Sequence, residues 1–201
     1  MDRKVPAPHM ALIRRRMQQI AQLPAEVLAR AHATLIHRPI AIHVFDAHQD
    51  GPAFGARALA ALTEPDGPLH GLEVQFQHEA YDWNDTAPLA RLLAGLTARN
   101  AIIAASSEGG LFEYGSDDAI VANLTALARA GVPIVAGSVT SSSALRKRMI
   151  AQANFRLFPR GLEGFAPLAE RSGYAIAESR TAVMSEQVLL RPPAAVPPSR
   201  L

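Results

Sequence analysis

One continuous stretch, residues 100–140, most constrains what this chain of 201 residues can fold into. It begins with an apolar run at 101–105, which is followed by the polar, glycine-rich segment 106–110. An amphipathic helical pattern over 116–130 then leads to a second apolar run at 132–139. This order of strand, loop, helix and strand predicts two parallel strands joined by a right-handed crossover. Polar residues just past such a strand stand where open α/β sheets bind ligands.

The rest of the chain repeats this alternation of short apolar runs and helical patterns. It predicts an α/β domain with a mostly parallel sheet and an antiparallel pair of strands at the C-terminus, because the last turn is too short for a crossover. The expected strands are 40–45, 72–77, 101–105, 133–138, 174–178 and 186–190, with helices near 53–62, 86–96, 116–130, 141–154 and 162–171. The first four strands are expected to be parallel neighbours in one sheet.

Three segments are expected along the chain. Residues 1–39 form an N-terminal arm with two helices, near 10–23 and 24–38. Residues 40–191 form the α/β domain, and the proline- and alanine-rich tail 192–201 is expected to be disordered.

Composition excludes several classes of function. The chain has no cysteine, which excludes disulfides, thiolate catalysis and cysteine-ligated zinc. No apolar run approaches the roughly 18–20 residues of a membrane span, and the net charge is only +2. The basic clusters at 14–16 and 146–148 are interpreted as solvated helix faces. We therefore expect a cytoplasmic protein that binds a small molecule and neither nucleic acid nor membrane, and a homo-oligomer remains open.

The closing segments LAERSG (168–173), YAI (174–176) and VLLR (188–191) resemble the end of class I S-adenosylmethionine-dependent methyltransferases. The resemblance covers residues 40–191 and rests on the order of elements and a loose pattern. It implies a Rossmann-like methyltransferase fold, S-adenosylmethionine as the cofactor and methyl transfer to a small molecule.

The resemblance also implies a role for each polar strand end. Asp46, with Ala47, would bind the ribose hydroxyls of the cofactor at the end of the second family strand. The loop at Tyr81, Asp82 and Trp83 would contact the adenine. Ser106 would lie beside the methionine moiety, and the remaining implied substrate contacts are Ser107, Gly109, Phe112 and Tyr114.

Glu108 is the candidate general base, since a carboxylate at a strand end can reach a substrate proton. Each of these residues also has a purely structural interpretation. Ser106 and Ser107 also suit a polar turn, because no nucleophile elbow surrounds them. Glu108 also suits a solvated loop. Trp83, Phe112 and Tyr114 also suit packing against the sheet and its loop.

The chain departs from the family in its glycines. The family's first strand ends in a G-x-G-x-G loop, whereas residues 1–50 contain no glycine. By this alignment the first strand and its loop are missing, which predicts weak or absent cofactor binding. A shortened relative, a natural variant without cofactor and an incomplete gene product all fit. A second alignment makes 40–45 the first strand and 51–55 a degenerate glycine loop.

Two other functions remain open. A non-catalytic binding or assembly module could keep the sheet and dispense with the glycine loop. The D-x-H-x-D spacing of Asp46, His48 and Asp50 is similar to a metal motif of the arginase family, which implies a divalent-metal hydrolase. The rest of that family's signature is absent from this sequence, so no metal ligand is assigned.

Overall fold

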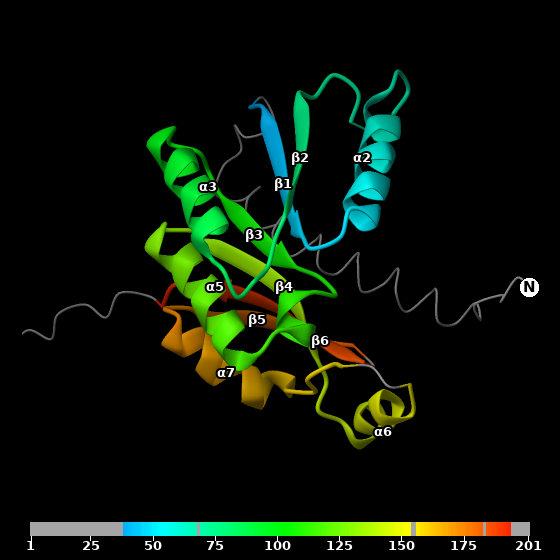
Figure 1. Cartoon of the computed structure of the whole chain (residues 1–201), viewed down its shortest axis with the longest axis vertical. Helices are drawn as coiled ribbons and strands as arrows, with labels where there is room; N and C mark the ends of the chain where they lie inside the picture. The colour runs from blue at the N-terminus through cyan, green and yellow to red at the C-terminus, as the bar shows by residue number, and fades with distance from the viewer. Residues whose placement is uncertain (1–37, 68, 154–155, 183, 194–201) are drawn as a thin grey trace, which may run out of the picture.

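The computed structural model describes residues 38–67, 69–153, 156–182 and 184–193. Figure 1 shows their arrangement. The expected helices at 10–23 and 24–38 and most of the expected tail lie outside these residues.

Helices and strands occur in the expected order, and the labels below are those of Figure 1. The elements are β1 (Ile40–Asp46), α2 (Asp50–Thr63), β2 (Val74–Ala80), α3 (Ala87–Ala98), β3 (Ala104–Ser107), α4 (Leu111–Tyr114), α5 (Asp117–Arg129), β4 (Ile134–Thr140), α6 (Ala144–Ala153), α7 (Gly161–Arg171), β5 (Ala175–Thr181) and β6 (Ser185–Arg191).

Local capping explains the boundaries of the central helix. Ser116 begins α5, and its hydroxyl accepts a 3.1 Å hydrogen bond from the backbone N–H of Ala119. Gly131 follows the helix with a φ of +71°, a conformation that glycine adopts without strain. These two signals are readable in the sequence, and the predicted helix is confirmed.

Several boundaries differ from expectation, and one expected loop contains a helix. β3 begins at Ala104 rather than at residue 101, because the N–H of Ala101 still bonds to the carbonyl of Leu96 at the end of α3. β2 begins at Val74 because a turn through Gly71, which has a φ of +81°, precedes it. The expected loop at 111–115 contains the short helix α4.

The strands divide into two sheets rather than one. β1 and β2 form a parallel pair, and the second sheet has the order β3-β4-β6-β5. β3 and β4 are parallel, while β6 runs antiparallel to both β4 and β5. The expected strand directions are confirmed, but the expectation of one continuous sheet is wrong.

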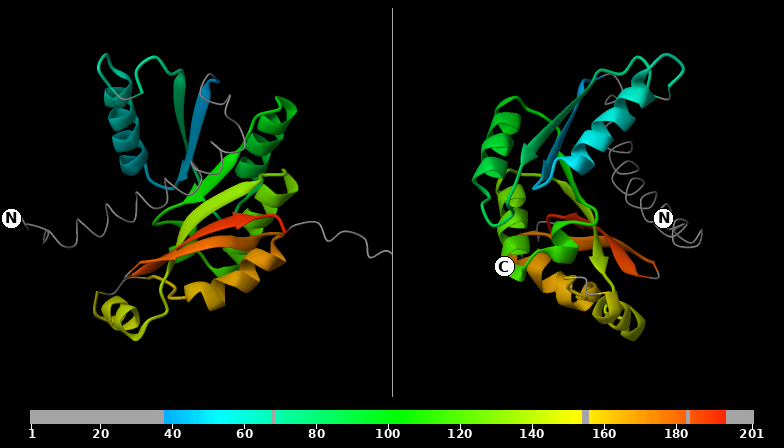
Figure 2. Two further views of the ribbon diagram at one scale, coloured as in Figure 1. Left: turned by 180° about the vertical axis from the view of Figure 1, so that it is seen from behind. Right: turned by 45° about the vertical axis from the view of Figure 1, so that its right-hand side comes forward.

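The position of the division follows from the handedness of the connections. Figures 1 and 2 show α2 and α3 on opposite faces of the β1–β2 pair. Right-handed crossovers on opposite faces carry the chain in opposite directions across a sheet. β1 therefore lies on the side of β2 that faces β3, and the division falls between β1 and β3. The helices change face at this same place, which makes it a topological switch point.

The hydrophobic core belongs to the second sheet. Among the described residues, the buried aliphatic and aromatic side chains begin at Leu93, and before it only Pro52 is buried. α5 and α7 cover β4 and β6 with Leu124, Phe165 and other side chains that are fully buried. In contrast, Ile40, Leu62 and Phe54 in the first half are 41%, 42% and 67% exposed. The β1–α2–β2 half thus lacks a closed core of its own.

Candidate functional site

The candidate site is built from the loops that follow β1, β2 and β3. Each loop leaves the carboxyl end of a parallel strand, and β1 and β3 lie on the two sides of the division between the sheets. Ligands of open α/β sheets bind at this end of the strands, outside a switch point. The topology therefore brings the sequence-predicted polar segments to the same end of the fold.

Asp46 is the last residue of β1 and is exposed. Its Oδ1 accepts a 2.8 Å hydrogen bond from the backbone N–H of His48, which turns the chain into α2. Its backbone carbonyl accepts from the N–H of Tyr81 at 3.3 Å. Ala47 is exposed beside it. The carboxylate is thus held at the strand end and open to solvent, which suits a group that would accept hydrogen bonds from a diol.

The loop after β2 has a similar turn. Oδ1 of Asp82 accepts from the backbone N–H of Asn84 at 2.9 Å and from its side-chain Nδ2 at 2.8 Å. Trp83 is half-buried, and its carbonyl accepts a 2.7 Å hydrogen bond from Nδ2 of Asn123. Burial, with the negative charges of Asp85 and Asp82 in addition, raises the pKa of Tyr81 to about 12. Tyr81 therefore stays a neutral hydrogen-bond donor at neutral pH.

A hydrogen bond to β4 holds the loop after β3. The backbone N–H of Gly109 donates to the Ser138 hydroxyl at 3.4 Å, and Ser138 is fully buried. Ser107 is half-buried, and its hydroxyl accepts from the N–H of Phe112 at 3.4 Å. Ser106 and Glu108 are exposed. Ser107 thus contributes to the turn, whereas Ser106 and Glu108 face solvent at the strand end.

The two aromatic residues predicted to contact substrate have different positions. Phe112 is only 1% exposed, and its ring packs 4.8 Å from that of Phe165. This burial removes Phe112 from the candidate substrate contacts and makes it a core residue. Its apolar neighbours in the sequence do not distinguish the two roles. Tyr114 is 40% exposed and stays available for contact.

Two residues at this loop were not found by sequence reasoning. Glu113 is 2% exposed, and its Oε1 accepts a 3.2 Å hydrogen bond from the Thr140 hydroxyl. Its carbonyl accepts from the N–H of Phe158 at 2.9 Å. Both partners lie more than twenty residues away along the chain, so no local pattern marks Glu113.

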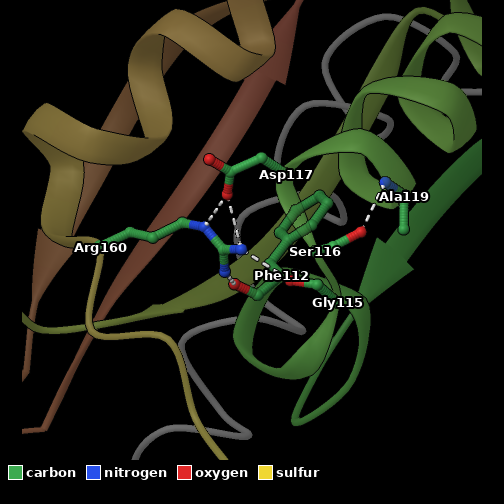
Figure 3. Close-up of polar contacts among 6 residues, drawn as sticks. All are labelled: Phe112, Gly115, Ser116, Asp117, Ala119 and Arg160. Carbon is green, nitrogen blue, oxygen red and sulfur yellow. Dashed lines mark hydrogen bonds and ion pairs between the residues drawn. The ribbon is translucent and has the colours of Figure 1, made fainter.

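Arg160 is the second missed residue, and Figure 3 shows its contacts. Its guanidinium donates to the carbonyl of Gly115 at 2.6 Å and to that of Phe112 at 3.3 Å. It also donates to Oδ1 of Asp117 at 2.8 Å, and it stacks 4.5 Å from the ring centroid of Phe158. Arg160 thus fixes the end of α4 against the segment that precedes α7.

The described residues form neither the metal site nor the degenerate glycine loop of the two alternative interpretations. Among them, no group of three His, Asp or Glu side chains is placed to hold a metal ion, so Asp46, His48 and Asp50 do not converge. Residues 51–55 lie inside α2 and form no glycine loop, which contradicts the second alignment. None of the described helices has the length and apolar character needed to cross a membrane.

Comparison with known proteins supports the fold. No protein-family model matches the chain, and no curated protein matches it in sequence. The magnesium protoporphyrin IX methyltransferase of Synechocystis PCC 6803, solved with bound S-adenosylhomocysteine, is a similar structure, with a TM-score of 0.60 at 12% identity over 95% of this chain and 90% of that chain. An O-methyltransferase from neocarzinostatin biosynthesis, in complex with S-adenosylhomocysteine and 1,4-dihydroxy-2-naphthoic acid, has a TM-score of 0.51 at 16% identity over 83% of this chain and 45% of that chain. The chain therefore has the Rossmann-like fold of class I S-adenosylmethionine-dependent methyltransferases.

Proposed function

We propose that this chain binds S-adenosylmethionine and acts as a methyltransferase-like protein on a small molecule. The observation that supports it most is the exposed carboxylate of Asp46, held at a strand end beside the switch point. The resemblance of the fold to two methyltransferases solved with S-adenosylhomocysteine adds to this support. Localisation in the cytoplasm is part of the proposal.

Each site residue has a proposed role. Asp46 and Ala47 would hold the ribose, Asp82 and Trp83 would border the adenine, and Ser106 would border the methionine moiety. The half-buried ring of Trp83 and the exposed carboxylate of Asp46 fit an adenosyl group chemically. When bound, the cofactor supplies an electrophilic methyl group.

The acceptor would lie over the loop after β3. Ser107, Gly109 and the exposed ring of Tyr114 would contact it. Glu108 would take the proton that the acceptor loses when it gains a methyl group, because its exposed side chain stands at the strand end. Phe112 has no direct role in this proposal, since it is buried.

Binding of S-adenosylhomocysteine, measured by titration calorimetry on the full chain, tests the proposal. Without a glycine loop we expect a dissociation constant weaker than about 100 μM. Asp46→Ala should weaken binding at least about tenfold, because each lost hydrogen bond to the charged group is worth about 1.5–3 kcal/mol. Asp46→Asn should do less harm, since its amide oxygen still accepts.

A matched control is Asp66→Ala, which removes an exposed carboxylate of the α2–β2 turn and should leave binding unchanged. Two results would contradict the proposal. Low-micromolar binding that Asp46→Ala does not alter would show that Asp46 is not the ribose ligand. No saturable binding at all would favour the second candidate function.

That second candidate is a non-catalytic binding or assembly module. The division of the described strands into two sheets favours it, because strands at the edge of a sheet can pair with another polypeptide. Such a module needs the strands and helices but neither Asp46 nor Glu108.

A further inference from the structure

Charge is divided unevenly along this chain. Residues 46–85 contain eight Asp and Glu residues and one Arg, whereas residues 141–162 contain five Lys and Arg residues and neither Asp nor Glu. All eight of the acidic residues are exposed. The net charge of the whole chain is only +2, so the division is local and not a general excess of one sign. Opposite charges on two surfaces of one protein attract copies of that protein to each other.

The outer face of α2 and the turn after it form an acidic surface with exposed apolar side chains. Phe54 is 67% exposed and Leu62 is 42% exposed, and their spacing of eight residues puts both on the same side of the helix. Glu64 is the residue at which α2 ends and Asp66 follows it in the turn, and both are exposed. We call Phe54, Leu62, Glu64 and Asp66 the acidic surface.

The outer face of α6 forms a basic surface. Among the described side chains of this helix none is buried; Met149 and Ile150 are half-buried on one side, while Lys147 and Arg148 are exposed on the other. Leu145 is 58% exposed beside them, and within the described part of the chain no ion pair joins Lys147 or Arg148 to a carboxylate. We call Leu145, Lys147 and Arg148 the basic surface. A helix of ten residues has little stability of its own in water, so a partner on this face would stabilise it.

The two surfaces are too far apart to meet within one molecule. Figures 1 and 2 show α2 and α6 at opposite ends of the molecule in every view. A second copy supplies what each surface lacks, namely carboxylates for Lys147 and Arg148 and a helix face for Phe54 and Leu62. A nucleic acid would match the cations of α6 but would leave the apolar face of α2 uncovered.

We propose that this chain associates with itself, with the acidic surface of one copy against the basic surface of the next. This inference does not depend on cofactor binding. Such a contact joins two different surfaces, so an assembly that does not close on itself keeps one of each kind free at its ends. Association would cover apolar side chains that the β1–α2–β2 half exposes.

Analytical ultracentrifugation of the full chain tests the proposal. Over about 1–200 μM protein at low salt, we expect the mean mass to rise above the 21.5 kDa of one chain. In about 1 M salt the mass should return to that of one chain, because the range of electrostatic attraction falls to about 3 Å.

Two charge-changing variants identify the surfaces. Lys147→Glu with Arg148→Glu makes both surfaces acidic, whereas Glu64→Lys with Asp66→Asn removes the acidic one, and asparagine tolerates the φ of +73° at position 66. Each variant alone should associate at least about tenfold more weakly than the parent chain, since like charges then face each other or attraction is lost. An equimolar mixture of the two variants should associate again, because the reversed α6 of one meets the reversed α2 of the other. This recovery also shows that both variants are folded.

Two further variants complete the test. Arg91→Glu with Arg99→Glu is the matched control, because it reverses two exposed cations at α3 and should leave the mass unchanged. Phe54→Gln should weaken association about tenfold without lowering the melting temperature, since the ring is 67% exposed.

Three results would overturn the proposal. One is the mass of a single chain at every protein concentration in low salt. Another is a mixture of the two charge variants that associates no better than either alone. The third is a chain that stays monomeric but binds duplex DNA through Lys147 and Arg148, which would make the basic surface a nucleic-acid site.

Discussion

The hydroxyl of Tyr81 donates a 2.6 Å hydrogen bond to Oδ1 of Asn123, and this bond joins the two halves of the molecule. Tyr81 follows β2 of the first sheet, while Asn123 is 3% exposed within α5 of the second. The Asn123 amide also donates to the carbonyls of Trp83 at 2.7 Å and Ala119 at 2.8 Å. The side-chain oxygen and nitrogen of Asn123 therefore both have hydrogen-bond partners, which makes this buried polar side chain favourable in an otherwise apolar layer.

Removing this contact should loosen the first half selectively. Asn123→Ala leaves the Tyr81 hydroxyl and the Trp83 carbonyl without their partner, so we expect a loss of about 1–3 kcal/mol. Hydrogen exchange within 40–80 should accelerate more than exchange within β4 and β6. Tyr81→Phe keeps the edge-to-face contact with Phe45, whose ring centroid is 4.8 Å away, and should have a smaller effect. Uniform acceleration in both halves would contradict this role.

Stability should fall at alkaline pH. Burial raises the pKa of Tyr174 from 10.0 to about 12, and its hydroxyl donates to the Val132 carbonyl at 2.8 Å. Between these two pH values the unfolded tyrosine releases its proton first, so the folded state binds more protons and the free energy of unfolding decreases as pH rises. The contribution is complete below pH 10 and is lost through pH 12.

Melting temperatures from about pH 9 to about pH 11.5 measure this effect. Tyr174→Phe removes the titrating group and should flatten the decline, although the variant is less stable at neutral pH because a hydrogen bond is lost. Tyr81→Phe should flatten it as well, since the pKa of Tyr81 is also raised to about 12. A decline of unchanged slope in both variants would assign the alkaline instability to other groups.

Gly137 should not tolerate a side chain. A Cβ atom there would lie 2.5 Å from the Phe112 ring and 2.8 Å from the Ser107 carbonyl oxygen. Gly137→Ala should therefore cost about 1–3 kcal/mol in urea unfolding, because the strand and the loop must move apart. Gly95→Ala is the matched control in α3, where a Cβ would meet nothing within 4 Å. It should stabilise the protein by about 0.5–1 kcal/mol. A neutral Gly137→Ala would show that the loop after β3 is not tightly packed.

Replacement of Arg160 by lysine should lower the stability of the protein. Its side chain is 7% exposed, and one ammonium group cannot reproduce its bonds to Gly115, Phe112 and Asp117. We expect Arg160→Lys to cost about 1–3 kcal/mol and to increase proteolytic cleavage within 107–116. Asp117→Asn should change stability by less than about 1 kcal/mol, because Asp117 is 62% exposed. If the lysine variant is as stable as the parent chain, the backbone acceptors do not need the guanidinium.

Four of the candidate site residues lie where the sequence placed them relative to the strands. Asp46, Asp82 and Ser106 were implied by the family resemblance and Glu108 by its place after a strand, and each one is exposed at or just past a strand end. Their roles towards a ligand stay predictions. Phe112, Glu113 and Arg160 were misjudged or missed, since their environments depend on Phe165, Thr140 and Gly115, which lie 27 or more residues away along the chain.

The sequence by itself determined the kinds of elements, their order and the strand directions, because hydrophobic periodicity, helix caps and turn glycines act within a few residues. Only the tertiary structure decided that the sheet divides between β1 and β3 and that the core belongs to the second half. The physical reason is that strand pairing and burial depend on contacts between distant segments, which no local pattern encodes.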